Sequence, residues 1–344
     1  KKTLKKWLTF VLKTVTICIL NDRKGRRKMA HELEIVNGEA QMAYVGDVPW
    51  HGLGVKVPED TSAMDMMALA GLDWRVEELE SFVEFNGEKI PTGSKALVRD
   101  IDSKVMTQVG ANWNPVQNSE AFEFFNEFVE AGNMKMHTAG SLKDGQIVWA
   151  LAKVDDDFEL FNGDKVESFL LFSNPHQYGK SIDIRFTPIR VVCNNTLTYS
   201  LGKQADNAVK LNHRKAFDSE NVKATLGIAR SKMKDYREMA QYLGSKRYNA
   251  TSLDEYLTEL FGTKTGTKGD LTRTGETVRD LMETQPGAEY AEGSWWTAYN
   301  AVTYFTDHVA GRSNDTRMQS AWFGANQKKK MDSLQKALEY ADAE

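Results

Sequence analysis

The sequence has little of the chemistry that small secreted proteins and metal-dependent proteins rely on. Its 344 residues include two cysteines, which excludes a disulfide framework and every zinc module that needs several cysteines. The six histidines are scattered and form neither an HExxH motif nor a close helical pair with a carboxylate. We therefore expect no metal site. The chain is nevertheless 41% apolar and 10% aromatic, which suffices for a real core and excludes wholesale disorder.

The small net charge of −4 hides segments of opposite sign. Residues 1–28 carry ten basic residues against one acid, a charge of +9, whereas residues 29–175 carry 10 basic and 26 acidic residues, a charge of −16. Residues 176–250 hold 14 basic and 6 acidic residues, a charge of +8, and residues 251–344 come to −5. A +8 stretch within an acidic protein is where an anionic ligand would bind.

Residues 1–28 fit two interpretations. Apolar residues at helical spacing from Leu4 to Ile19, with lysines among them, are typical of a basic amphipathic helix on an anionic membrane. Alternatively, if its arginines use AGA or AGG codons, the string KGRRK before Met29 is a translated purine-rich tract like a bacterial ribosome-binding site. We favour the second interpretation. It predicts that residues 1–28 are a leader outside the fold and that the protein starts at Met29, without a membrane partner.

Residues 29–215 have the pattern of an α+β domain. Strand-like segments at 74–79 and 81–85 precede the hairpin turn Asn86-Gly87, and segments at 96–99 and 105–109 flank an acidic turn at 100–102. An amphipathic helix is expected over 121–131. Further strands are expected at 146–152, 169–173 and 181–186, and residues 189–201 are interpreted as a helix that starts after Pro188.

The chain changes character from Asp218 onward. Apolar stripes at helical spacing predict helices at 218–243, 253–261, 275–283, 294–309 and 326–341. The fold class expected is therefore α+β: an antiparallel sheet with packed helices over 29–215, followed by a helical C-terminal region over 218–344.

Three segments resemble catalytic or metal-binding motifs without meeting their requirements. The loop 262–268 has the composition of a P-loop, but it follows a helix and Thr267 stands where the second glycine is needed. The run Asp155–Asp157 is interpreted as a solvated acidic turn between strands rather than a cation site. Cys193 could be a nucleophile activated by Arg190 with His176 or His213 as base, but its apolar neighbours favour a buried core cysteine. We expect no catalytic residues, no cofactor and no enzyme activity.

The basic stretch is the candidate nucleic-acid interface. Arginine and lysine neutralise phosphates, while asparagine and aromatic side chains hydrogen-bond or stack on bases. A solvated surface would also be rich in these residues, so both interpretations stay open, and the acidic segment 29–175 confines any binding to a local groove. The candidate binding residues are Arg185, Arg190, Asn194, Asn195, Lys203, Lys210, Arg214 and Lys215, with Tyr178, Phe186 and Tyr199 as candidates for stacking.

Several short segments resemble a known family, the phage/plasmid-like proteins that contain domain of unknown function 932. The resemblance extends from about residue 42 to residue 340 and leaves out residues 1–28. The segments that carry it are VPWHGLG (48–54), VG (109–110) with WNPVQN (113–118), TAGSL (138–142), FSNPH (172–176), 188–197, 295–308 and AWFG (321–324).

The resemblance implies an origin in a phage, prophage or plasmid and a place in the bacterial cytoplasm. Mobile elements of this kind often encode single-strand annealing proteins, which are small α+β sheets with a basic groove that assemble into rings or filaments. By this analogy we expect non-enzymatic binding or annealing of single-stranded DNA in recombination or replication, by a protein that could form homo-oligomers. The alternative is a protein–protein adaptor or host-takeover factor that binds through its acidic half.

Overall fold

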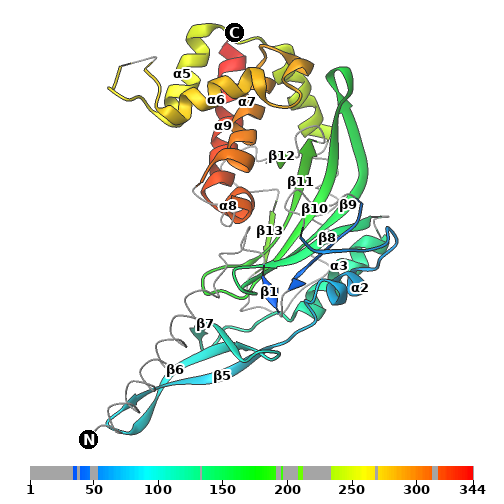
Figure 1. Ribbon diagram of the computed structural model, residues 1–344, viewed down its shortest axis with the longest axis vertical. Coiled ribbons are helices and arrows are strands. Elements are labelled where there is room, and N and C mark those ends of the chain that lie inside the picture. Colours follow the sequence, from blue (N-terminus) through cyan, green and yellow to red (C-terminus); the bar gives the residue numbers. More distant parts are fainter. Residues whose placement is uncertain are drawn as a thin grey trace, which may run out of the picture.

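The computed structural model describes residues 34–36, 39–46, 53–131, 134–190, 195–196, 208–211, 234–267, 270–311 and 317–343. These residues form a main sheet flanked by two helices, a second sheet at one end of the molecule and a helical region at the other end (Figure 1). The expected α+β class, with mostly antiparallel strands in the N-terminal half and a helical C-terminal region, is confirmed.

The main sheet has the strand order β12-β11-β10-β9-β8-β3-β4, and β13 also pairs with β11. Its strand pairs are antiparallel except β3 and β4, which are parallel. The bounds are β12 (Asn195–Thr196), β11 (Ile182–Arg190), β10 (Asp164–Pro175), β9 (Ile147–Leu160), β8 (Lys135–Leu142), β3 (Met42–Tyr44), β4 (Val55–Lys56) and β13 (Ala208–Leu211).

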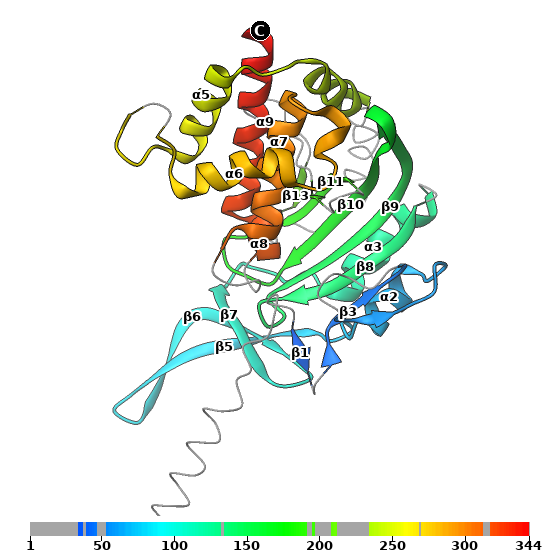
Figure 2. The same ribbon diagram turned by 45° about the horizontal axis from the view of Figure 1, so that its top comes forward.

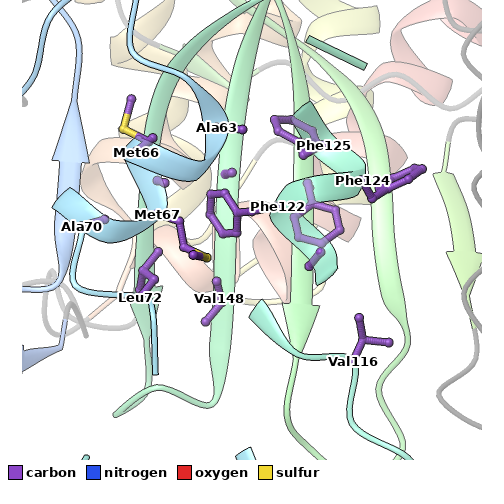
Figure 3. Close-up of a cluster of buried hydrophobic side chains, with 14 of the residues drawn as sticks. Ala63, Met66, Met67, Ala70, Leu72, Val116, Phe122, Phe124, Phe125 and Val148 are labelled. Carbon is purple, nitrogen blue, oxygen red and sulfur yellow. The ribbon is translucent and has the colours of Figure 1, made fainter. Parts of the chain in front are cut away.

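One face of this sheet is covered by α2 (Ala63–Leu69) and α3 (Asn118–Ala131). Phe122 and Phe125 of α3 are fully buried, as the helical spacing predicts, and they join Met67 of α2 and Val148 of β9 in one core (Figure 3). Alternate residues of β9 face the other side, where Trp149 meets Trp322 edge to face at 4.9 Å. The β9 strand is apolar on both faces because both are covered.

The second sheet consists of β5 (Val76–Phe85), β6 (Glu88–Arg99) and β7 (Lys104–Gly110), in that order. The turn between β5 and β6 is Asn86-Gly87, with φ of 52° and 80° at the two residues. Positive φ at both central residues suits asparagine and glycine, so the turn follows directly from the sequence. A short hairpin of β1 (Ile35–Val36) and β2 (Glu39–Ala40) precedes the main sheet.

The helical region contains a helix over 234–245, α5 (Ala250–Phe261), α6 (Arg273–Thr284), the 3-10 helix η3 (Ala288–Ala291), α7 (Trp295–Tyr304), the π-helical turn η4 (Phe305–Val309), α8 (Arg317–Phe323) and α9 (Ala325–Ala343). The helices expected at 253–261, 275–283, 294–309 and 326–341 all correspond to these elements. Of the described helices, none is long and apolar enough to cross a bilayer.

The end of β9 and the start of β10 reach the helical region (Figure 2). Phe158, Leu160 and Val166 are buried there in one cluster with Tyr236 and Trp296. This corrects the interpretation of Asp155–Asp157 as a turn, because β9 runs through all three residues to Leu160. The chain turns instead through the 3-10 helix η2 (Phe161–Gly163). The three aspartates lie at an irregularity of the strand, because Val154 pairs with Ser168 and Phe158 with Val166, which leaves 155–157 opposite Glu167 alone. Lys153 and Lys165 reach the Asp157 carboxylate at 3.3 and 3.6 Å.

The expected helix over 189–201 is also wrong where the structure describes it. Ile189 and Arg190 continue β11, opposite Glu167 and Val166 of β10, and residues 195–196 form β12. Pro188 does not end the strand. On the side of β11 away from β10, β13 pairs with residues 182–185 and β12 with residues 189–190. Pro188 lies between these two segments, so no described strand on that side requires the N–H group that proline lacks.

Candidate nucleic-acid interface

The backbone pairing of β11, β12 and β13 brings four of the eight predicted binding residues onto neighbouring strands. Arg185 and Arg190 both lie on β11. Arg190 pairs with Asn195 of β12, and Lys210 of β13 pairs with Asp183, two residues before Arg185. Residues up to 25 positions apart in the sequence therefore lie along one edge of the main sheet, Lys210 near the start of β11 and Asn195 at its end.

Arg185 is tied to groups inside the protein. Its Nε donates to Asp183 Oδ1 at 2.7 Å, and a second nitrogen donates to Asp183 Oδ2. Its remaining nitrogen donates to the carbonyl oxygen of Trp322 at 3.0 Å. The Arg185 and Asp183 side chains are 13% and 10% exposed. Arg185 thus joins β11 to α8, and its charge is largely balanced by Asp183.

A second ion pair, near Arg185, is buried in the helical region. Lys330 Nζ of α9 lies 2.8 Å from Asp307 Oδ1 of η4, and the two side chains are 0% and 5% exposed. Burial lowers the pKa of Lys330, Asp307 opposes that shift, and the nearby charge of Arg185 adds to it. A buried ion pair of the helical region, Lys330 with Asp307, therefore lies close to Arg185 at the β11 edge of the main sheet. A π-helical turn such as η4 often marks a functional region.

The other predicted residues can be placed less fully. Arg190, Asn195, Lys210 and Phe186 are placed by backbone, whereas Asn194, Lys203, Arg214, Lys215, Tyr199 and the candidate nucleophile Cys193 lie outside the described residues. Tyr178, in the turn between β10 and β11, is 64% exposed and has the exposed Lys180 two residues away.

A second polar network, which the sequence did not reveal, holds the segment 113–118 against the end of β10. His176 Nε2 pairs with Asn118 Oδ1 at 3.0 Å, and both side chains are buried. Asn118 Nδ2 donates to the carbonyl of Leu72, and Asn174 Nδ2 donates to that of Val116. His176, one of the two candidate bases for Cys193, lies inside the fold, with its ring 5.4 Å from that of Trp74.

A third buried group lies where the two sheets meet. Arg99 donates to Glu34 Oε1 at 2.5 Å and holds both carboxylate oxygens of Asp102 at 2.9 and 2.5 Å. Its guanidinium also lies 5.4 Å from the Trp74 ring. The hydrogen bond and charge of Arg99 lower the pKa of Asp102. The sequence carries one sign of this buried group: Arg99 ends an expected strand and directly precedes the acidic turn 100–102.

Metal ligation finds no support in the part of the chain that the structure describes, since no three His, Cys, Asp or Glu residues there are grouped to hold an ion. Each of the three buried polar groups described above joins separate elements of the fold: Arg185 joins β11 to α8, His176 and Asn174 hold the segment 113–118, and Arg99 holds Glu34.

Comparison with known proteins gives one family. No curated protein and no solved structure matches this chain. The sequence pattern of one family matches residues 105–322, from β7 to α8, which includes the His176 network, the β11 edge and η4. Segment 48–54, β5 and β6 precede the match. Because the match covers more than half of the sequence, the chain belongs to the family described as Domain of unknown function (DUF932).

Proposed function

We propose that this protein binds single-stranded DNA at the β11 edge of the main sheet and catalyses no reaction, acting in annealing during the recombination or replication of a mobile element in the bacterial cytoplasm. The observation that carries the proposal is the pairing of β11 with β12 and β13, which places Arg185, Arg190, Asn195 and Lys210 along one edge of the main sheet, with Arg190 and Asn195 five residues along β11 from Arg185. Basic residues spaced along a sheet edge can each neutralise a phosphate of an extended single strand.

Arg185 has a positioning role in this proposal. Since its guanidinium is held by Asp183 and the Trp322 carbonyl, it supports the edge strand, and phosphate contacts fall to Arg190, Lys210 and the basic residues that follow in the chain. Tyr178 is exposed enough to stack on a base, and stacking tolerates any base sequence.

The proposal is tested by a gel shift of the protein starting at Met29 with a labelled single-stranded oligonucleotide at 50 and 200 mM salt. The full chain is run beside it, because its +9 segment would bind DNA without specificity. If four phosphates are neutralised, affinity should fall about 50-fold between the two salt concentrations. No binding at 50 mM salt would end the proposal.

A protein–protein adaptor that works through the acidic half is the second candidate. It is favoured by β5 and β6, where Phe82, Val83, Phe85 and Ile90 are each 45–65% exposed. An adaptor would leave the oligonucleotide unshifted, so the same gel separates the two functions.

A further inference from the structure

Strands β5 and β6 and their turn, residues 76–99, form an arm that projects from the body of the protein (Figure 1). Strand β7 pairs with β6 from Ser94 to Arg99. Beyond Ser94, β5 is the sole described partner of β6, so residues 81–92 form a two-stranded ribbon. A two-stranded hairpin is marginally stable in water unless something packs against it.

One face of the arm is apolar and exposed along its length. Val83 pairs with Ile90 across the two strands, and Leu79 and Phe85 lie on the same face of β5 because side chains alternate along a strand. These four side chains, the apolar stripe of the arm, are 45–65% exposed. Large apolar side chains that gather on one exposed face mark a docking surface.

The charged residues on this face are both acids. Glu88 pairs with Phe85, and Glu77 lies two residues before the first side chain of the apolar stripe, so a glutamate lies at each end of the stripe. Lys89 and Lys95 pair with even-numbered residues of β5 and therefore lie on the opposite face. The face is complementary to an apolar surface that carries cations near its ends.

The dimensions of the face favour an α-helix as the partner. Two strands lie about 4.8 Å apart, so with its side chains the ribbon is close to the width of a helix, about 10 Å. Eight residues separate Glu77 from Phe85, which is about 26 Å of strand, and a helix of about 18 residues spans this distance. Charged residues along β5 and Pro91 on β6 disfavour the addition of a strand instead.

A second copy of this chain is disfavoured as the source of that helix. Surface lysines of the described helical region are paired with acids: Lys234 with Glu238, Lys264 with Glu276 and Lys336 with Glu259. These surfaces would bring acids as well as cations to the glutamates of the arm, and like charges in an interface cost free energy.

We propose that the apolar face of the arm binds an amphipathic basic helix of a different protein. The apolar side of that helix covers the apolar stripe, and lysines or arginines near its two ends pair with Glu77 and Glu88. The helix thereby supplies the second layer that a sheet with an exposed apolar face lacks. The arm is separate from the β11 edge, and binding there requires no DNA.

The first experiment measures, by fluorescence anisotropy at 50 and 500 mM salt, the binding of a labelled 18-residue peptide with leucine on one helical face and lysine on the other. One control peptide has the same composition in scrambled order, and the other has glutamate in place of lysine. The leucine–lysine peptide should bind with a Kd of about 1–10 μM at 50 mM salt and more weakly at 500 mM salt. No binding, or equal binding of either control peptide, overturns the proposal.

The apolar stripe has its own test. Val83→Thr with Phe85→Ser should weaken binding of the leucine–lysine peptide about 30-fold, as expected for side chains at the centre of an interface. The matched control is Val55→Thr with Leu69→Gln, which alters side chains that are 43% and 47% exposed and lie off the arm. Equal affinity of the two variants would refute a role for the arm.

A charge reversal tests the two glutamates. Glu77→Lys with Glu88→Lys should abolish binding of the leucine–lysine peptide and create binding of the peptide with glutamate. Glu59→Lys with Asp60→Lys changes the net charge equally, off the arm, and should leave the affinity within about twofold. An equal loss in both variants would show general attraction to an acidic protein and contradict a site on the arm. All four residues are exposed, so the fold should tolerate these changes.

The remaining outcomes identify other occupants of the same face. The peptide is tested with the full chain and with the protein starting at Met29, and binding is expected for both. Binding by the shorter protein alone would assign the face to residues 1–28 of the same chain. Self-association in sedimentation velocity that Val83→Thr with Phe85→Ser abolishes would assign it to a second copy. Either result overturns the proposal of a different protein, and neither bears on the proposed DNA binding.

Discussion

Replacing Arg99 should destabilise the protein more than replacing any exposed ion-pair residue of the same sheet. Arg99 is 1% exposed, and its partner Glu34 is 3% exposed. Arg99→Met would leave the Glu34 carboxylate buried without its guanidinium partner. Of the hydrogen bonds described for Glu34, the one donated by the Ser141 hydroxyl at 2.9 Å would remain. It would also remove the guanidinium from the Trp74 ring.

The magnitude follows from the burial of the pair. Removing one partner of a buried ion pair costs about 3–5 kcal/mol. The contact with Trp74 adds about 0.5–1 kcal/mol. Asp102, which is 36% exposed, can be solvated again and adds little. We expect Arg99→Met to lower the free energy of unfolding by about 4 kcal/mol.

The assay is denaturant unfolding followed by tryptophan fluorescence. The matched control is Lys95→Met, which breaks an ion pair with Glu78 that is about one third exposed and should cost no more than about 1 kcal/mol. Combining Arg99→Met with Glu34→Leu should recover part of the loss, because the buried charge disappears. A loss below about 1 kcal/mol for Arg99→Met, or no recovery in the double variant, would refute the reasoning.

Three further predictions concern the helical core and the main sheet. Gly244→Ala would place a Cβ 1.9 Å from the Phe161 ring and should lower the free energy of unfolding by about 1–3 kcal/mol. Phe161→Leu should partly relieve this loss. An unchanged melting temperature of Gly244→Ala would contradict the packing of η2 on the helix 234–245. Lys330→Met should cost about 3–5 kcal/mol in denaturant unfolding, because Asp307 loses its buried cation, and a neutral effect would place the pair in solvent. Burial lowers the pKa of His137 in the folded state. As the pH falls below about 6.5, the unfolded state therefore binds a proton that the folded state does not, and the free energy of unfolding should decrease. His137→Gln should flatten this pH dependence in unfolding curves recorded at pH 5–7.

Local patterns predicted the elements whose ends and faces are decided within a few residues. Helix α3 has Phe122 and Phe125 at helical spacing, and the Asn86-Gly87 turn has residues that accept positive φ. The C-terminal helices follow from their apolar stripes in the same way, with caps such as Asn249 before α5. These features need no knowledge of distant parts of the chain.

The errors arose where a distant strand or charge decides the structure. Residues 189–190 are a strand because β10 pairs with them. Asp155–Asp157 lie in a bulge of β9 because β10 pairs with β9 on both sides of them, and Lys153 and Lys165 contact Asp157 there. The involvement of Arg185 with Asp183 and Trp322 depends on a helix 137 residues further along the chain. The sequence could indicate a basic stretch, but not which of its members are held by internal partners.

The measurement that tests the proposed function most directly is fluorescence anisotropy of a labelled single-stranded oligonucleotide with charge-reversal variants of the protein starting at Met29. Replacing Arg190, Arg214 and Lys215 by glutamate should weaken binding at least about 30-fold at 50 mM salt and reduce its salt dependence. Replacing the exposed Lys56, Lys89 and Lys135 by glutamate changes the net charge equally and should weaken binding far less. Retained affinity in the first variant, or an equal loss in both, would contradict DNA binding by the basic stretch from Arg185 to Lys215.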